Sequence, residues 1–193
     1  NLKQILSNYL DSNIEAMNKI AVFCSASDYI DSVYTEKAAQ FGAWMGENRK
    51  WLVYGGSNRG LMETVACAAK EKGAMIMGVI PTKLEERGMV SDLLDVTFHT
   101  VNLSDRKDIM LQEADVMVAL PGGVGTLDEI FHVMAGGTIG YHDKKIIFYN
   151  VNGFWDDILH FLKGLEEQRF AHHPLNNYMQ VANTFEELIQ LLA

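Results

Sequence analysis

The sequence predicts a doubly wound α/β domain in which helices cover both faces of a mostly parallel sheet. Short apolar runs without strict polar alternation, such as Trp51–Tyr54 and Val116–Leu120, are typical of strands buried on both faces. Segments with helical apolar spacing separate these runs along most of the chain. The 193 residues suit a single domain with a substantial core. We therefore expect a ligand crevice at the carboxyl ends of the strands.

The first half of the chain shows clear apolar spacing. We expect an amphipathic leader helix over residues 1–18, because apolar residues recur there at helical intervals, at Leu2, Ile5, Leu6, Tyr9 and Leu10. Residues 19–193 are expected to form the domain itself. Its first predicted elements are a strand over 20–24, a helix over 33–48, a strand over 51–54, a helix over 61–72 ended by Gly73, and a strand over 75–80 that runs into Pro81.

The second half resumes the alternation after a charged, flexible-looking stretch over residues 82–95. Ser104 and Thr126 are the expected N-caps of two of its helices. A last helix follows a polar loop that contains His172 and His173, which we expect to be solvated. The predicted elements are a short strand over 97–101, a helix over 105–113, a strand over 116–120, a helix over 127–135, a strand over 146–150, and helices over 154–168 and 185–192.

Composition excludes several classes of function. A formal net charge of -9 argues against general binding of nucleic acid, which needs a basic face. No apolar stretch approaches membrane-spanning length, and the first residues lack the layout of a signal peptide, so we expect a cytoplasmic protein without membrane contact. Cys24 and Cys67 have neither metal-ligand nor redox spacing. We expect both cysteines to be reduced and mostly buried.

The segment from Val116 to Glu129 is the most informative part of the chain. An apolar run stops at Pro121, three glycines follow within four positions (Gly122, Gly123 and Gly125), and a helix is predicted to start directly afterwards. Glycines let the backbone approach a ligand, and the free N–H groups of a helix N-terminus attract anions. The order of strand, glycine turn and helix therefore predicts a binding site for the phosphate of a nucleotide or sugar phosphate.

Another glycine turn, the first of the two along the chain, runs from Tyr54 to Met62. Its Gly55 and Gly60 have the separation found in a P-loop, but Leu61 and Met62 stand where that motif needs Lys and Ser or Thr. Neither turn reads G-x-G-x-x-G, and Ser57 lacks the second glycine of a nucleophile elbow. Each turn alone is also compatible with a plain strand-to-helix connection. Two such turns at one sheet edge favour a binding crevice.

Arg106 and Glu129 are the charged candidates beside these turns. Arg106 is predicted in the first turn of its helix, where the dipole disfavours a cation by about 0.3–1 kcal/mol unless an anion binds nearby. An exposed arginine there would also cost little, so a surface role stays open. Glu129 fits either a catalytic role or a capping box with Thr126. Glu129 and His132 have di-metal spacing, but no second copy exists, so no metal is expected.

These residues together resemble the LONELY GUY (LOG) family, whose members were long labelled lysine decarboxylases. The family signature P-G-G-x-G-T-x-x-E matches residues 121–129, and Arg106-Lys107 matches the upstream Arg-Lys pair. Further matches fall in order and spacing over about residues 20–170. They are Val22-Phe23-Cys24, Tyr54-Gly55-Gly56, Gly60-Leu61-Met62, Gly78-Val79-Ile80-Pro81 and Gly140-Tyr141-His142-Asp143-Lys144.

The resemblance implies a Rossmann-like fold and a cytokinin riboside 5'-monophosphate phosphoribohydrolase, or a related purine nucleotide hydrolase. Such an enzyme cleaves the N-glycosidic bond of a nucleoside 5'-monophosphate to free base and ribose 5-phosphate, without a cofactor. It also implies a homodimer, which we expect to form through residues 127–141. Arg106 and Glu129 would be the catalytic pair. The implied substrate-binding residues are Ser25, Gly55, Gly56, Met62, Lys107, Pro121, Gly122, Gly123, Gly125 and Thr126.

Several positions depart from the family pattern. Ser25-Ala26-Ser27 replaces Gly-Ser-Ser, Ser57 replaces a third glycine, Glu63 replaces a glycine, and Leu103 replaces a methionine. Gly136 and Thr138 stand where Trp and Gln are common, beside the expected base pocket. The base preference is therefore open. A non-catalytic carrier on the same scaffold, like the molybdenum cofactor carriers, is the alternative. A purely structural dimer would leave both glycine turns and Arg106 unexplained.

Overall fold

The computed structural model describes residues 18–171 and 173–193, in which strands and helices alternate. The predicted leader helix and His172 lie outside the described residues. The strands are β1 (Lys19–Phe23), β2 (Trp51–Tyr54), β3 (Met75–Pro81), β4 (Val96–Thr100), β5 (Val116–Ala119), β6 (Ile146–Tyr149) and β7 (Met179–Ala182). The helices are α2 (Ser32–Glu47), α3 (Gly60–Glu71), α4 (Thr82–Glu85), α5 (Leu103–Glu113), α6 (Val124–Thr138), α7 (Asp156–Glu167) and α8 (Phe185–Leu191).

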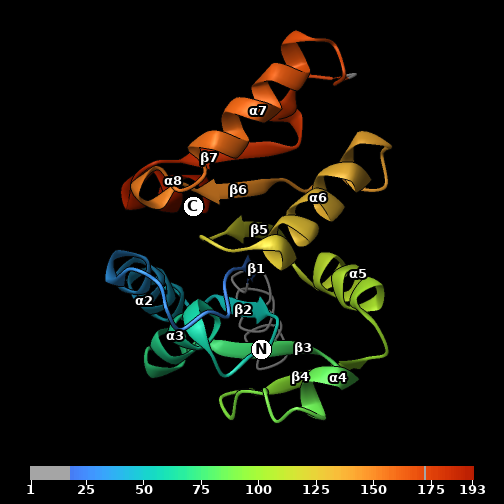
Figure 1. The fold of residues 1–193 in the computed structure, drawn as a ribbon. Helices are drawn as coiled ribbons and strands as arrows, with labels where there is room; N and C mark the ends of the chain where they lie inside the picture. The colour runs from blue at the N-terminus through green and yellow to red at the C-terminus, as the bar shows by residue number, and fades with distance from the viewer. Residues whose placement is uncertain (1–17, 172) are drawn as a thin grey trace, which may run out of the picture.

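The strands form one sheet in the order β4-β3-β2-β1-β5-β6-β7 (Figure 1). Every pairing between named strands is parallel; β1, for example, pairs Ile20 with Leu52 of β2 and with Val116 of β5. The chain winds outward from β1 in one direction as far as β4, and then in the other direction from β5 to β7. The strand order therefore reverses between β1 and β5, which is where doubly wound sheets hold their ligands.

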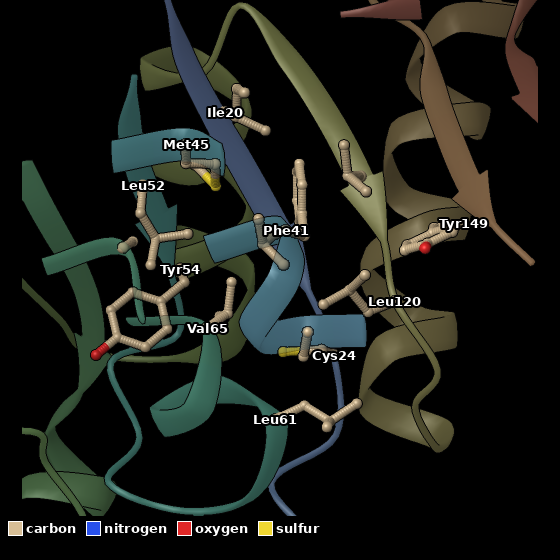
Figure 2. Packing of buried hydrophobic residues seen from close by; sticks show 14 of the residues in the cluster. Ile20, Cys24, Phe41, Met45, Leu52, Tyr54, Leu61, Val65, Leu120 and Tyr149 are labelled. Atoms are coloured by element: carbon tan, nitrogen blue, oxygen red, sulfur yellow. The ribbon is translucent and has the colours of Figure 1, made fainter. Parts of the chain in front are cut away.

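Two hydrophobic clusters cover the two faces of this sheet. Alternate residues of β1 and β2, such as Ile20 and Leu52, pack with Phe41 and Met45 of α2 and with Val65 of α3 (Figure 2). The residues between them, such as Ala21 and Val53, pack with side chains of α5, α6 and α7 on the opposite face. Because both faces are covered, the strands lack polar alternation. The predicted doubly wound α/β fold is confirmed, with an entirely parallel arrangement of the named strands.

Three local predictions were wrong. No strand was expected at β7, a short edge strand of four residues that only β6 pairs with. Cys67 is exposed, although Cys24 is buried as expected, and both are free thiols. Residues 82–95, called the strap below, looked flexible but are fastened to the first glycine turn: the N–H of Ser91 donates to the Gly56 carbonyl at 2.8 Å, and Ser57 pairs with Val90 in an antiparallel bridge.

The described helices include none that is both long enough and apolar enough to span a bilayer. His173 is exposed, as expected for the polar loop that precedes β7.

Lys144 fixes the C-terminal end of α5. Its Nζ donates to the carbonyls of Leu111 at 2.7 Å and of Ala114 at 2.6 Å. The last carbonyls of a helix have no partner within it, and a cation at that end also matches the helix dipole. The position of α5, and of the side chains at its start, therefore depends on a residue from the loop before β6.

We expect Lys144→Met to lower the free energy of unfolding by about 1.5–3 kcal/mol, because charged hydrogen bonds to two partly buried carbonyls are lost. Denaturant unfolding followed by circular dichroism measures the change. Lys145→Met is the matched control, since the Lys145 side chain makes no hydrogen bond or ion pair in the described structure, and it should change stability by less than about 0.5 kcal/mol. Equal effects of the two substitutions would contradict this role.

Candidate active site

A cavity of about 290 Å³ opens where β1 and β5 end side by side. Four segments form its walls: the loop after β1, the first turn of α3, the first turn of α5, and the start of α6. Eight of the predicted site residues line it, namely Ser25, Met62, Arg106, Lys107, Gly123, Gly125, Thr126 and Glu129. The topology thus brings residues from four separate parts of the chain to the place where the strand order reverses, between β1 and β5.

The second glycine turn has two kinds of glycine. A Cβ on Gly122 would collide with the Thr126 hydroxyl, so the packing of the protein requires this glycine. A Cβ on Gly123 or Gly125 would meet no atom within 4 Å, and neither residue has a positive φ. Neither packing nor backbone conformation therefore demands glycine at these two positions. Both face open space at the N-terminus of α6, where free N–H groups favour an anion.

The predicted start of this helix was wrong by three residues. α6 begins at Val124 with Gly123 as its N-cap, so Thr126 lies inside the first turn. Glycine is about as frequent as threonine at N-caps, which explains the misplacement. A capping box between Thr126 and Glu129 is therefore excluded. Likewise, α5 begins at Leu103 because the Asn102 side chain, not that of Ser104, accepts N–H bonds at 2.8 and 2.9 Å.

Glu129 is buried at the cavity wall, with a relative exposure of 7%. Burial raises the pKa of its carboxyl to about 7, and the positive charge of Arg106 limits the rise. No ion pair joins Glu129 to Arg106 in the described structure, which shows no nitrogen–oxygen contact between them within 4.0 Å. Near neutral pH the carboxyl therefore exists in both protonation states, which is the condition that suits acid–base and electrostatic catalysis.

Arg106 also lines the cavity and is buried, with a relative exposure of 8%. Its Nε donates to the Val79 carbonyl at 3.1 Å, and its Nη2 has no hydrogen-bond partner among the described residues. A Cβ on Gly55 would collide with this Nη2. The absence of a side chain at Gly55 thus makes room for the guanidinium, which retains an unused donor for an anionic ligand.

Four predicted substrate-binding residues do not line the cavity but shape it. Gly55 and Gly122 leave space for Arg106 and Thr126, as described above. Gly56 has a φ of +71°, and a Cβ there would lie 2.8 Å from Ile80. The Pro121 carbonyl accepts a bond from the N–H of Ser25 at 3.1 Å, which joins the loops after β1 and β5.

Sequence reasoning missed four residues that line the cavity: Cys24, Ala26, Leu103 and Asp128. Cys24 and Ala26 directly follow β1, so knowledge of the strand order would have found them. Burial, together with the neighbouring Glu129, raises the pKa of the Cys24 thiol well above its ordinary value, so the thiol is neutral and not an activated nucleophile. Asp128 pairs with Lys107 at 2.8 Å and joins α6 to α5 at the rim.

Two other candidates lie outside the cavity. His132 contacts Asp108 at 3.1 Å, and the described residues contain no group of three or more His, Cys, Asp or Glu that could hold a metal ion. Gly136 was expected beside the base pocket, but a Cβ there would lie 2.8 Å from Nε2 of His142. Within one chain, glycine at this position makes room for a histidine and does not border the cavity.

Comparison with known proteins places this site in context. A family model described as "Possible lysine decarboxylase" matches residues 62–192. The cytokinin riboside 5'-monophosphate phosphoribohydrolase LOG3 of Arabidopsis thaliana is 32% identical over 174 residues, which cover 90% of this chain and 81% of that protein. The probable cytokinin riboside 5'-monophosphate phosphoribohydrolase LOGL6 of Oryza sativa subsp. japonica is also 32% identical, over 90% of this chain and 70% of that protein.

Solved structures share the fold. The molybdenum cofactor binding protein from the phototrophic bacterium Rippkaea orientalis superposes with a TM-score of 0.70 at 25% identity, covering 91% of this chain and 95% of that chain. The Moco carrier protein from Chlamydomonas reinhardtii gives the same TM-score at 21% identity. Because the family model and the curated relatives both match most of its length, the chain belongs to the LOG family, whose family model is described as "Possible lysine decarboxylase".

Proposed function

We propose that this protein hydrolyses the N-glycosidic bond of a purine or cytokinin nucleoside 5'-monophosphate, releasing free base and ribose 5-phosphate. One observation carries the proposal: a buried carboxyl with a raised pKa and a buried arginine with a free donor share one cavity at a helix N-terminus. The names of the curated relatives support this reaction and suggest a cytokinin riboside 5'-monophosphate as one substrate.

The 5'-phosphate is expected at the start of α6. Gly123 and Gly125 leave the backbone N–H groups open there, and Thr126 adds a hydroxyl to the same wall. Charge-assisted bonds from main-chain N–H groups hold a phosphate without requiring a positive field from the whole protein. This placement is compatible with the net charge of -9 and puts the ribose near Glu129, about one helical turn further along α6.

Glu129 then lies where positive charge develops. Cleavage of a ribosyl–base bond passes through an oxocarbenium-like state, which an ionised carboxylate beside the ribose stabilises. The bonding electrons leave with the base, the oxygen of a water molecule bonds to the anomeric carbon of the ribose, and the proton that the water loses neutralises the departing base. Arg106 supplies its free Nη2 to the phosphate or to a ribose hydroxyl. Its charge also opposes the effect of burial on Glu129 and so favours the reactive ionised form.

We also propose that two copies associate through the region of residues 127–141. Phe131 on α6, and Ile139 and Tyr141 directly after it, are exposed apolar side chains in this region. Exposed apolar side chains within one short stretch of chain mark a surface that suits burial against a partner.

A carrier is the second candidate, favoured by the likeness to the molybdenum cofactor binding protein. A carrier needs affinity without turnover, and it has no use for an ionisable carboxyl beside the ribose. The cavity volume of about 290 Å³ lies just below the range that is common for ligand sites, about 300–1,000 Å³. Both features favour the hydrolase over a carrier of a large cofactor.

The direct test is to incubate the protein with AMP and with a cytokinin riboside 5'-monophosphate and to measure ribose 5-phosphate. We expect Glu129→Gln to lower kcat by at least about 100-fold, because the variant cannot stabilise positive charge, while AMP still binds. Asp128→Asn, which changes the adjacent rim carboxylate, should have a much smaller effect on kcat. Binding of a larger cofactor without turnover of any nucleotide would contradict the hydrolase proposal and support the carrier function instead.

The pH dependence should follow the carboxyl of Glu129. Its pKa in the free protein is about 7, and the ionised form is the active one, so kcat/KM should rise with pH to a plateau above this value. Below it, kcat/KM should fall about tenfold per pH unit. Since Asp128 contributes to raising this pKa, Asp128→Asn should move the midpoint to lower pH. If the pH profile of kcat/KM had the same midpoint in Glu129→Gln, the titrating group would be the substrate phosphate and not Glu129, which would contradict this prediction.

Gly125→Ala should weaken AMP binding while it stabilises the fold. Gly125 has a helical conformation and open space at its Cβ, so alanine should stabilise the fold by about 0.4–1 kcal/mol. The added methyl group should weaken AMP binding about tenfold or more, because it keeps the phosphate from the N–H groups. Gly164→Ala within α7 is the matched control for calorimetry and unfolding: it should stabilise without changing binding. Unchanged AMP affinity in Gly125→Ala would exclude the phosphate from this position.

A further inference from the structure

A second cavity of about 480 Å³ lies on the other side of Arg106. It is bounded by the end of β3, by the strap, and by the connection from β4 to α5, which lie together at one end of the sheet (Figure 1). We call it the annex; Lys83, Leu84, Arg87, Val101, Leu103 and Arg106 are among the residues that border it. Leu103 and Arg106 line both cavities and therefore form the partition between them.

Three cationic side chains border the annex. Lys83 and Arg87 come from the strap and are exposed, whereas Arg106 is buried. None of the three takes part in an ion pair within the described part of the chain, and the nearby Glu85 contacts His99 at 2.8 Å instead. Three unpaired cations around one hollow are unexpected in a chain with a net charge of -9. Together they favour an oxyanion in the annex.

The partition links the annex to the proposed reaction. Nε of Arg106 is held by the Val79 carbonyl at the end of β3, while Nη2 is buried and has no partner. The guanidinium is thus held by a hydrogen bond at Nε, while its Nη2 keeps an unused donor. It borders both the cavity that contains Glu129 and the annex. Because Leu103 and Arg106 line both cavities, a ligand that contacts Arg106 from the Glu129 side lies next to the annex.

We infer that the annex is a second anion subsite, which takes an additional phosphoryl group on the ribose of a nucleotide whose 5'-phosphate lies at α6. The inference rests on the proposed function and extends it. The chain is a ribosyl hydrolase that prefers nucleoside bisphosphates to plain monophosphates. Lys83 and Arg87 hold the second phosphoryl group, and Leu103 packs against the sugar between the two anionic ends.

Calorimetric titration tests this inference in the Glu129→Gln background, where the nucleotide is not consumed. The ligands are AMP, adenosine 2',5'-bisphosphate and adenosine 3',5'-bisphosphate. One of the bisphosphates should bind about tenfold tighter than AMP, since two solvent-exposed cations each add a modest gain. Adding Lys83→Gln with Arg87→Gln should bring that ratio close to one. Adding Arg49→Gln with Lys163→Gln, which removes the same charge from exposed positions elsewhere, should leave the ratio unchanged.

The outcomes are distinct. If AMP binds but neither bisphosphate binds tighter, the annex is not a subsite, while the proposed function stands. A bisphosphate preference that survives Lys83→Gln with Arg87→Gln also overturns the assignment, because the second group then lies elsewhere. Inorganic phosphate that binds to the AMP-saturated protein, without any bisphosphate preference, would indicate a free anion and would equally overturn it. If AMP itself does not bind, the proposed function fails.

Discussion

Two buried, opposite charges that do not touch are the constraint on which this structure depends. Arg106 and Glu129 sit in the same cavity without an ion pair, so neither charge is neutralised by the other. Burial of an unpaired charge is costly, and here the carboxyl responds with a raised pKa while the guanidinium retains a free donor. The arrangement leaves both groups available to a ligand, and the phosphorylated sugar that we propose as substrate would offset the electrostatic cost of burying them.

The fold supplies the geometry that keeps these groups apart. Arg106 is carried by α5, whose start is capped by Asn102 and whose end is held by Lys144. Glu129 is carried by α6, which starts directly after the turn that follows β5. Because the strand order reverses between β1 and β5, the cavity opens between helices on rigid strands, with only short loops at its wall.

The glycines divide into two groups that the sequence pattern alone does not distinguish. Gly55, Gly56 and Gly122 are needed by neighbouring protein atoms or by a positive φ, whereas Gly123 and Gly125 face open space. Identical residue types in one motif thus serve the protein in some positions and leave room for a ligand in others. The resemblance to the LOG family identified the motif correctly, but only the atoms around each glycine show which role it has.

The sequence by itself determined the α/β class, most strand and helix positions to within a few residues, the family, and the expectation that Arg106 and Glu129 lie beside the glycine turns. These follow from local signals: apolar runs of strand length, helical spacing, and glycine turns of fixed order. Only the tertiary structure decided that Thr126 is not an N-cap, that the strap is tied to the first glycine turn, that Cys24 and Leu103 border the site, and that Arg106 separates two cavities. Each of these depends on contacts between segments far apart in the chain, and no local pattern of residues encodes such distances.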